Sequence, residues 1–266
     1  MFRLGYKMIR VSTAAMMVVL CSCTSSDKGV ANSEVRQNYQ QMIELVRTDV
    51  KNESQLLSVY RDFAKYDEQS GIWQSSLMLS AFYFRQANKS NDLIIQTALT
   101  KKALGYGQLS LAAGRRTKQA TQLYESYVQL FLLSGQSVYL NKAQPYASTE
   151  FMRNKLYYLS DDFANIMPLL DEGEATLTEQ AYVSFWIAKR EYNMALAQQA
   201  YQFFKQAKHS IGLGDSLYLM AKITLISERQ QALDYANRAL AVFSSLENTA
   251  AQNNILDWIN DHELAR

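Results

Sequence analysis

The composition of the chain favours helices and excludes several classes of protein. It has 266 residues with a formal net charge of +2, and its only prolines are Pro145 and Pro168. Few glycines and many Ala, Leu, Gln and Lys residues are typical of an all-α protein of ample length for a core or a solenoid. Without residues 1–22, which we expect to be removed, 24 basic residues stand against 25 acidic ones. A net charge of −1 gives no electrostatic basis for nucleic-acid binding.

Residues 1–22 have the pattern of a bacterial signal peptide. Arg3, Lys7 and Arg10 form a basic segment, and residues 11–20 form an apolar stretch that is too short to span a bilayer. A plain secretory signal or a short helical anchor would share these features. The residues that follow decide between these alternatives and a lipoprotein.

The segment Leu20-Cys21-Ser22-Cys23 resembles the lipobox of bacterial lipoproteins. Leu20 occupies the aliphatic position and Ser22 the small position before the acylated cysteine, whereas Cys21 would place bulky Leu20 at the small position. The resemblance implies acyl chains such as palmitate on Cys23, which hold a protein on a membrane without a spanning helix. Thr24 stands where inner-membrane lipoproteins often have Asp, which implies the outer membrane, facing the periplasm. No cysteine then remains for a disulfide, a nucleophile or a metal.

The rest of the chain has helical spacing of its apolar residues. Residues 23–32 are polar and predict a tether, and 33–266 predict an all-helical, repeat-like domain. In the first half we expect helices over about 53–68, 73–84, 95–106 and 120–134, with a break at Gly114. Residues 136–174 are the least regular, and we expect short helices and a longer loop there.

The C-terminal third shows the clearest pattern. We expect helices over about 177–189, 192–209, 215–227 and 230–246, and a capping helix over about 249–263. Gly212 and Gly214 are expected to separate the second helix from the third. Several of these helices have two apolar sides, which favours antiparallel pairs stacked against neighbours.

The segment 228–240 resembles the second helix of a tetratricopeptide repeat. Ala232 matches the small residue at the close crossing of the two helices, and Ala239 matches the later alanine. Residues 191–196 repeat part of this segment, with Ala195 standing 37 residues before Ala232. Met220 and the absence of a closing proline depart from the family pattern. The resemblance covers about 177–246 and implies a tetratricopeptide-like α-solenoid, with a generic helical bundle as the alternative.

The sequence offers no recognisable catalytic, cofactor or metal site, and we expect the protein not to be an enzyme. His209 and His262 have no partner nearby in sequence, and Gly212-Leu213-Gly214 lacks the further glycines of a phosphate loop. The acidic residues of the irregular region lack the alternating spacing of a calcium loop, and capping of helix starts explains them more simply. These residues are Asp161, Asp162, Asp171, Glu172 and Glu174.

Two groups are candidates for binding a partner. Tyr157 and Tyr158 lie in the tyrosine-dense middle of the chain, where such side chains suit either a binding surface or a seam between helices. Arg115 and Arg116, near Lys118, suit an acidic patch on a partner or a solvated helix start after Gly114.

These features together predict an envelope lipoprotein that binds another protein as a scaffold or assembly factor. Helical-repeat lipoproteins serve pilus, secretion, outer-membrane and peptidoglycan machinery, and the resemblance does not choose among these. The alternative is a ligand-binding accessory lipoprotein of a transport system. A deep pocket with convergent polar groups would favour that alternative.

Overall fold

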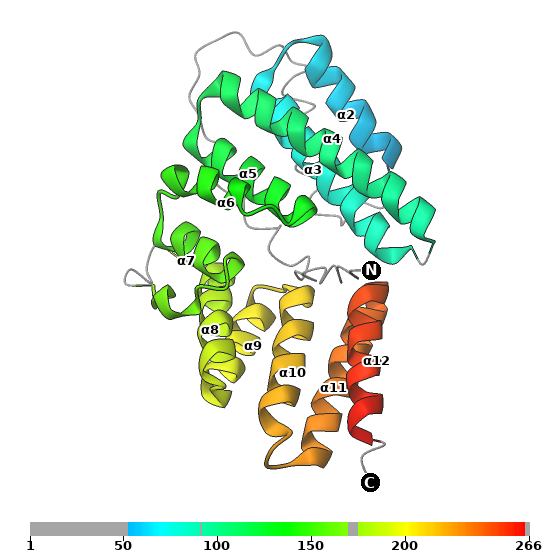
Figure 1. Ribbon diagram of the computed structural model, residues 1–266, viewed down its shortest axis with the longest axis vertical. Coiled ribbons are helices and arrows are strands. Elements are labelled where there is room, and N and C mark those ends of the chain that lie inside the picture. The colour runs from blue at the N-terminus through cyan, green and yellow to red at the C-terminus, as the bar shows by residue number, and fades with distance from the viewer. Residues whose placement is uncertain (1–52, 91, 170–174, 264–266) are drawn as a thin grey trace, which may run out of the picture. The chain divides into compact units, whose positions relative to one another are not determined.

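The computed structural model describes residues 53–90, 92–169 and 175–263, and these residues form helices and turns without strands (Figure 1). The predicted all-α class is confirmed, with adjacent antiparallel helices packed in pairs as in a tetratricopeptide-like solenoid. Within the described ranges, no helix is long and apolar enough to cross a membrane. The described chain divides into two compact units, unit 1 up to Ser148 and unit 2 from Thr149. The signal peptide, Cys23 and the tether lie outside the described residues.

Unit 1 is built on two long helices joined by a polar seam to a third. Trp73 Nε1 donates to Ser126 Oγ at 3.0 Å, Ser126 and Ser110 are hydrogen-bonded at 2.8 Å, and Gln129 donates to Ser80 Oγ at 3.0 Å. Because these polar groups are buried, a shift of the helices that left them unpaired would be costly, and the bonds therefore favour this alignment. The helices are α2 (Glu53–Lys65), α3 (Gln69–Lys89), α4 (Leu93–Thr117), α5 (Ala120–Ser134) and α6 (Val138–Ala143).

Gly114 does not break the chain, contrary to the sequence prediction. Helix α4 continues through it to Thr117, and Lys118 adopts the left-handed conformation that ends the helix. A Cβ atom at Gly114 would lie 3.5 Å from Gln122, and one at Gly107 would lie 3.1 Å from Leu130. Gly107 therefore allows α4 and α5 to approach closely, whereas a Cβ at Gly114 would make only an ordinary van der Waals contact. The turn follows four residues after Gly114, at Lys118.

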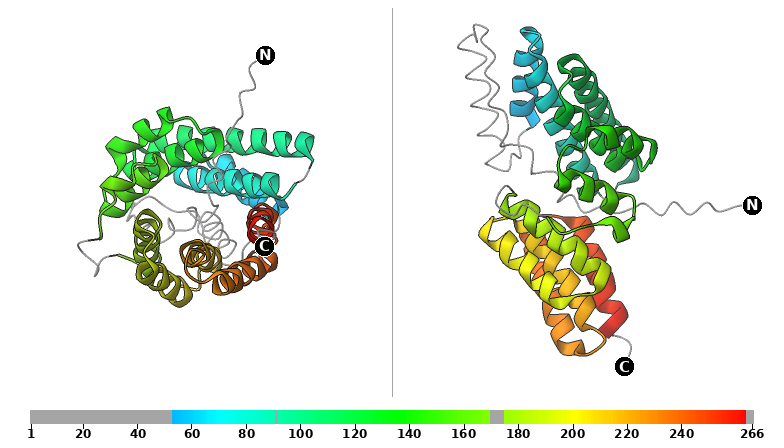
Figure 2. Two further views of the ribbon diagram at one scale, coloured as in Figure 1. Left: turned by 60° about the horizontal axis from the view of Figure 1, so that its bottom comes forward. Right: turned by 90° about the vertical axis from the view of Figure 1, so that its left-hand side faces the viewer.

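Unit 2 stacks helix pairs in two layers. Helices α8, α10 and α12 form one layer and α9 and α11 the other, and the left view of Figure 2 shows them close to end-on. Short helix α7 and a single 3-10 turn, Phe163–Asn165, precede the pairs, as expected for an irregular region. The helices are α7 (Glu150–Leu159), α8 (Leu177–Glu191), α9 (Met194–Gln206), α10 (Ser210–Thr224), α11 (Arg229–Ser245) and α12 (Thr249–Glu263).

Gly212 and Gly214 lie inside α10, so the predicted separation at these residues is wrong. A Cβ at Gly212 would lie 2.4 Å from the Phe204 ring, and one at Gly214 would lie 2.7 Å from the Phe243 ring. Both rings are buried from solvent. Each glycine therefore gives room to a phenylalanine of the other layer, and the turn between α9 and α10 falls earlier, at Lys208.

The repeat register also differs from the sequence alignment. Ala232 and Ala239 are fully buried, as predicted, but Ala195 is exposed. The buried residues of α9 are Ala197, Ala200 and Phe204, each of which stands 39 residues before its counterpart on α11, Ala236, Ala239 and Phe243. Helix α11 starts 35 residues after α9, and its buried counterparts lie four residues further into the helix, which together give the offset of 39.

Candidate functional site

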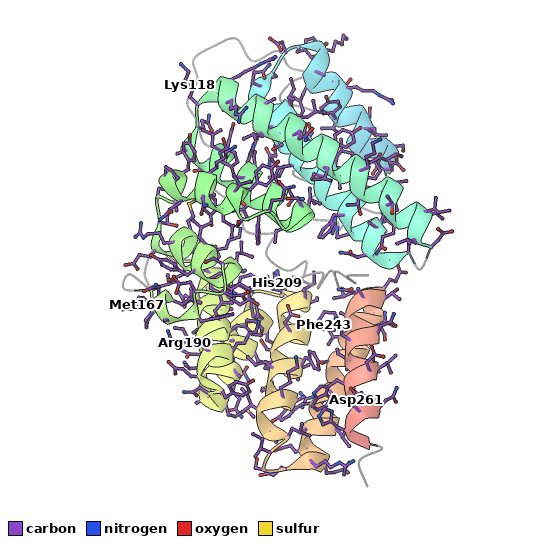
Figure 3. The ribbon with its side chains drawn as sticks, viewed as in Figure 1. Lys118, Met167, Arg190, His209, Phe243 and Asp261 are labelled. Carbon is purple, nitrogen blue, oxygen red and sulfur yellow. The ribbon has the colours of Figure 1, made fainter. Side chains whose placement is uncertain are left out.

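Residues 160–169 are held against α7 and α8 by two polar side chains. Arg190 donates to the carbonyls of Phe163 and Ile166 at 3.1 and 3.0 Å. The Asn154 amide donates to the Met167 carbonyl at 2.7 Å and accepts from the Met167 N–H at 3.1 Å. Figure 3 labels Arg190 and Met167 on this side of unit 2. These bonds place Phe163 beside Tyr158, with ring centroids 5.6 Å apart.

Trp186 of α8 lies at the centre of an aromatic cluster. Its buried indole stacks on three rings, with centroid distances of 5.0 Å to Tyr158, 5.6 Å to Phe151 and 5.7 Å to Tyr182. Burial of the Tyr182 and Tyr158 hydroxyls raises the pKa of each group well above its ordinary value of 10. Both tyrosines therefore stay neutral, and one ring of the cluster, Tyr158, contacts the Lys189 ammonium.

Two lysines occupy equivalent places on α8 and α10, 33 residues apart. The Lys189 ammonium lies 5.0 Å from the Tyr158 ring centroid and donates to its hydroxyl at 3.3 Å. The Lys222 ammonium lies 4.1 Å from the Tyr218 ring centroid. Both lysines are exposed, and among the described residues neither forms a salt bridge within 4.0 Å. Each ammonium group is thus held by a cation–π contact with a ring, which is a weak interaction at an exposed site.

Nearby charges influence the pKa of both lysines, and one carboxylate, Asp215, acts on each of them. Neighbouring atoms displace water from the Lys189 ammonium, and this desolvation lowers its pKa. The negative charges of Asp161 and Asp215 oppose the shift. Desolvation is also the largest cause that lowers the pKa of Lys222, and repulsion from Lys189 is the second. Asp215 again opposes the shift. Asp215 on α10 therefore influences the pKa of both ammonium groups.

The site continues onto α12 through Tyr218. Its ring meets Trp258 edge to face at 5.9 Å, and its hydroxyl donates to the Asn254 carbonyl at 3.3 Å. Burial, reinforced by the charge of Asp257, raises the pKa of Tyr218 to about 12. The layer formed by α8, α10 and α12 thus has aromatic rings and charged groups on each of its three helices.

We call this surface the lysine–tyrosine face and define it as Tyr158, Lys189, Asp215, Tyr218 and Lys222. Two cations, one carboxylate and two half-buried phenols can bond both polar and apolar groups of a ligand at once.

The predicted tyrosine pair belongs in part to this face. Tyr157 and Tyr158 are both half-buried and pack against the core of unit 2, so the seam alternative describes them better than a freely exposed pair. Tyr158 supports Lys189, whereas Tyr157 is outside the face. The sequence analysis missed Lys189, Asp215 and Lys222. An available signal was the recurrence of an aromatic residue four positions before lysine, in Phe185–Lys189 and Tyr218–Lys222.

The predicted arginine pair lies in unit 1 and is already engaged. Arg115 donates to the Tyr127 hydroxyl at 3.4 Å, and Arg116 lies 3.8 Å from an Asp67 carboxylate oxygen. Both arginines are in the last turn of α4, where cations favour the helix dipole, and not at a helix start as we predicted. Both remain exposed, so a partner's acidic patch can still reach them.

The His209 ring contacts two neighbouring helices, with centroid distances of 5.3 Å to Phe204 and 5.6 Å to Tyr182, whereas the His262 ring contacts Trp258 of its own helix. His209 is the N-cap of α10, where its Nδ1 accepts from the Gly212 N–H at 3.0 Å, and it is not in the last turn of α9 as expected (Figure 3). His262 Nδ1 lies 2.6 Å from the Trp258 carbonyl. Among the described residues, no cluster of His, Cys, Asp and Glu is placed to hold a metal ion. Acidic residues 171, 172 and 174, which were considered as helix caps or calcium ligands, lie outside the described part of the chain.

Comparison of the chain with protein-family models, curated proteins and solved structures gave no match to any of them. The class of protein that the fold and the face define is a helical-repeat protein with one polar and aromatic layer. Its function is therefore inferred from its own residues.

Proposed function

We propose that this protein is a lipid-anchored envelope protein that binds another protein on the lysine–tyrosine face of unit 2. In this proposal Cys23 is the lipidated residue, and the acyl chains attach the protein to the outer membrane, facing the periplasm. The protein acts as a scaffold or assembly factor for an envelope machine, such as pilus, secretion, outer-membrane or peptidoglycan machinery. It needs neither a cofactor nor catalytic residues for this role.

The observation that supports the proposal is the pair of ring-held lysines at equivalent positions of α8 and α10. Lys189 repels Lys222, and the charge of Asp215 only partly offsets this effect on the pKa of Lys222. A carboxylate of a bound chain would relieve it, and the adjacent rings would bury apolar parts of the same chain. Tyr158 is already packed against Trp186, so little ordering of this ring is needed on binding, which favours affinity.

The test compares two double variants with the same change of charge. Lys189→Gln with Lys222→Gln removes both cations of the face, whereas Lys205→Gln with Arg238→Gln removes two exposed cations from the other layer, on α9 and α11. Each tagged chain is purified from cross-linked envelopes, and its melting temperature is measured separately. We expect the first variant to lose its co-purified protein and the second to retain it, with similar melting temperatures.

Equal recovery of the co-purified protein by both variants would place the binding site elsewhere, with Arg115 and Arg116 as the next candidates. Recovery of no protein, together with a melting temperature raised by a small molecule, would support the alternative of a ligand-binding accessory lipoprotein.

A further inference from the structure

The beginning of α4 exposes three large apolar side chains in succession. The exposed fractions are 73 % for Leu93, 81 % for Ile94 and 51 % for Ile95. Asp92 orders this helix start, because its carboxylate accepts from the N–H groups of Ile94 and Ile95 at 2.7 and 3.2 Å. The apolar side chains are therefore held outward by a defined cap.

The direction of these side chains indicates what kind of partner they fit. Successive residues of a helix are 100° apart, so residues 93–95 cover about 200° of its circumference. A flat protein surface reaches only one side of such a helix end. A fluid apolar phase surrounds it and contacts all three side chains at once.

A positive charge further along α4 also fits an apolar phase that has an anionic surface. Lys101 is exposed and lies about 12 Å further along α4, since a helix rises 1.5 Å per residue. Lys102 is close to Glu53, at 4.0 Å, and the Asp92 carboxylate is bonded to the helix start. Because the tip enters the membrane with the first turn of α4, Lys101 stays outside the apolar layer, where anionic head groups can pair with it.

We propose that the α3–α4 tip, defined as Leu93, Ile94 and Ile95, inserts into the lipid interface of a membrane that contains anionic lipids. This contact is independent of lipidation at Cys23 and of partner binding in unit 2. Its result is a second point of attachment, which limits how unit 1 can turn on the membrane surface.

The test places a tryptophan at the tip and at a matched exposed site of the full chain. Ile94→Trp reports the tip, and Ile226→Trp reports the turn after α10, where the isoleucine is 91 % exposed. Each chain is reconstituted with vesicles of phosphatidylethanolamine and phosphatidylglycerol whose acyl chains are brominated. We expect quenching of the added fluorescence of Ile94→Trp to exceed that of Ile226→Trp at least about twofold, because only buried indoles meet the bromines.

Two further measurements decide between occupants. Changing Leu93 and Ile95 to Ser in the Ile94→Trp chain should abolish the excess quenching while leaving the melting temperature unchanged, since both side chains are exposed. Equal quenching at the two tryptophans would overturn the proposal, whether or not Cys23 is lipidated. An emission shift of Ile94→Trp that depends on protein concentration without vesicles would also overturn it, in favour of a second copy of the chain.

Discussion

Glycines inside helices of this protein have two opposite roles. Gly212 accommodates the Phe204 ring, which a Cβ would approach to 2.4 Å, whereas a Cβ at Gly105 would meet nothing within 4 Å. Gly105 is also exposed in the middle of α4. The first glycine is required by packing, and the second only increases the conformational entropy of the unfolded chain.

Alanine at these two positions should therefore change stability in opposite directions. We expect Gly212→Ala to lower the free energy of unfolding by about 1–3 kcal/mol, because the buried ring has no space to move. Gly105→Ala should raise it by about 0.5–1 kcal/mol through helix propensity. Urea denaturation followed by circular dichroism measures both. A gain in stability for Gly212→Ala would show that the α9–α10 packing is wrong.

At the scale of elements, the same turn recurs between helices in both units. A non-glycine residue with positive φ, such as Asp67, Tyr192, Lys208 or Glu247, is followed by a capping residue. The backbone N–H of the cap bonds the carbonyl five residues earlier, at 2.9 to 3.1 Å. The cap side chain then accepts from the N–H three residues later. The caps are Glu68, Asn193, His209 and Asn248.

His209 makes one of these turns sensitive to pH. Burial lowers its pKa below the ordinary value of 6.5, and its Nδ1 accepts a hydrogen bond only in the neutral form. Below pH 6.5 the unfolded chain therefore binds a proton that the folded chain does not. The contribution of the neutral His209 cap to the free energy of unfolding is fully present above pH 6.5. This contribution is lost as the pH falls toward the pKa of His209 in the folded chain, by at most about 1.4 kcal/mol per pH unit.

His209→Asn should keep the cap and remove this dependence, since asparagine caps the equivalent turns of α9 and α12. We expect the free energy of unfolding to change less between pH 7.5 and pH 5.5 in His209→Asn than in the wild type. His262→Gln is the control and should retain the wild-type dependence. Equal slopes in wild type and His209→Asn would assign the titration to other groups.

At the scale of the whole molecule, membrane attachment is proposed from Leu20-Cys21-Ser22-Cys23, which lies outside the described residues. Metabolic labelling with a clickable fatty acid should mark the wild type and Cys21→Ala, but not Cys23→Ala. Labelling that disappears only in Cys21→Ala would move the anchor to that residue. Equal labelling of wild type and Cys23→Ala would rule out lipidation at Cys23.

The sequence by itself determined the helical class and much of the C-terminal pairing. Residues such as Ala232 and Ala239 recur at helical spacing, and a helix face can be recognised from neighbours within a few turns. The capping turns were harder to place, because their left-handed residues are Asp, Tyr, Lys and Glu where glycine is the usual signal.

Only the tertiary structure decided which glycines break helices and which residues form the lysine–tyrosine face. Gly114 and Gly212 resemble helix ends in sequence, yet both lie inside helices, and Gly212 lies opposite the Phe204 ring, which requires the space. Lys189 and Lys222 are 33 residues apart and become neighbours only when α8 and α10 stack. Local pattern determines a helix, whereas contacts between distant residues determine what its surface meets.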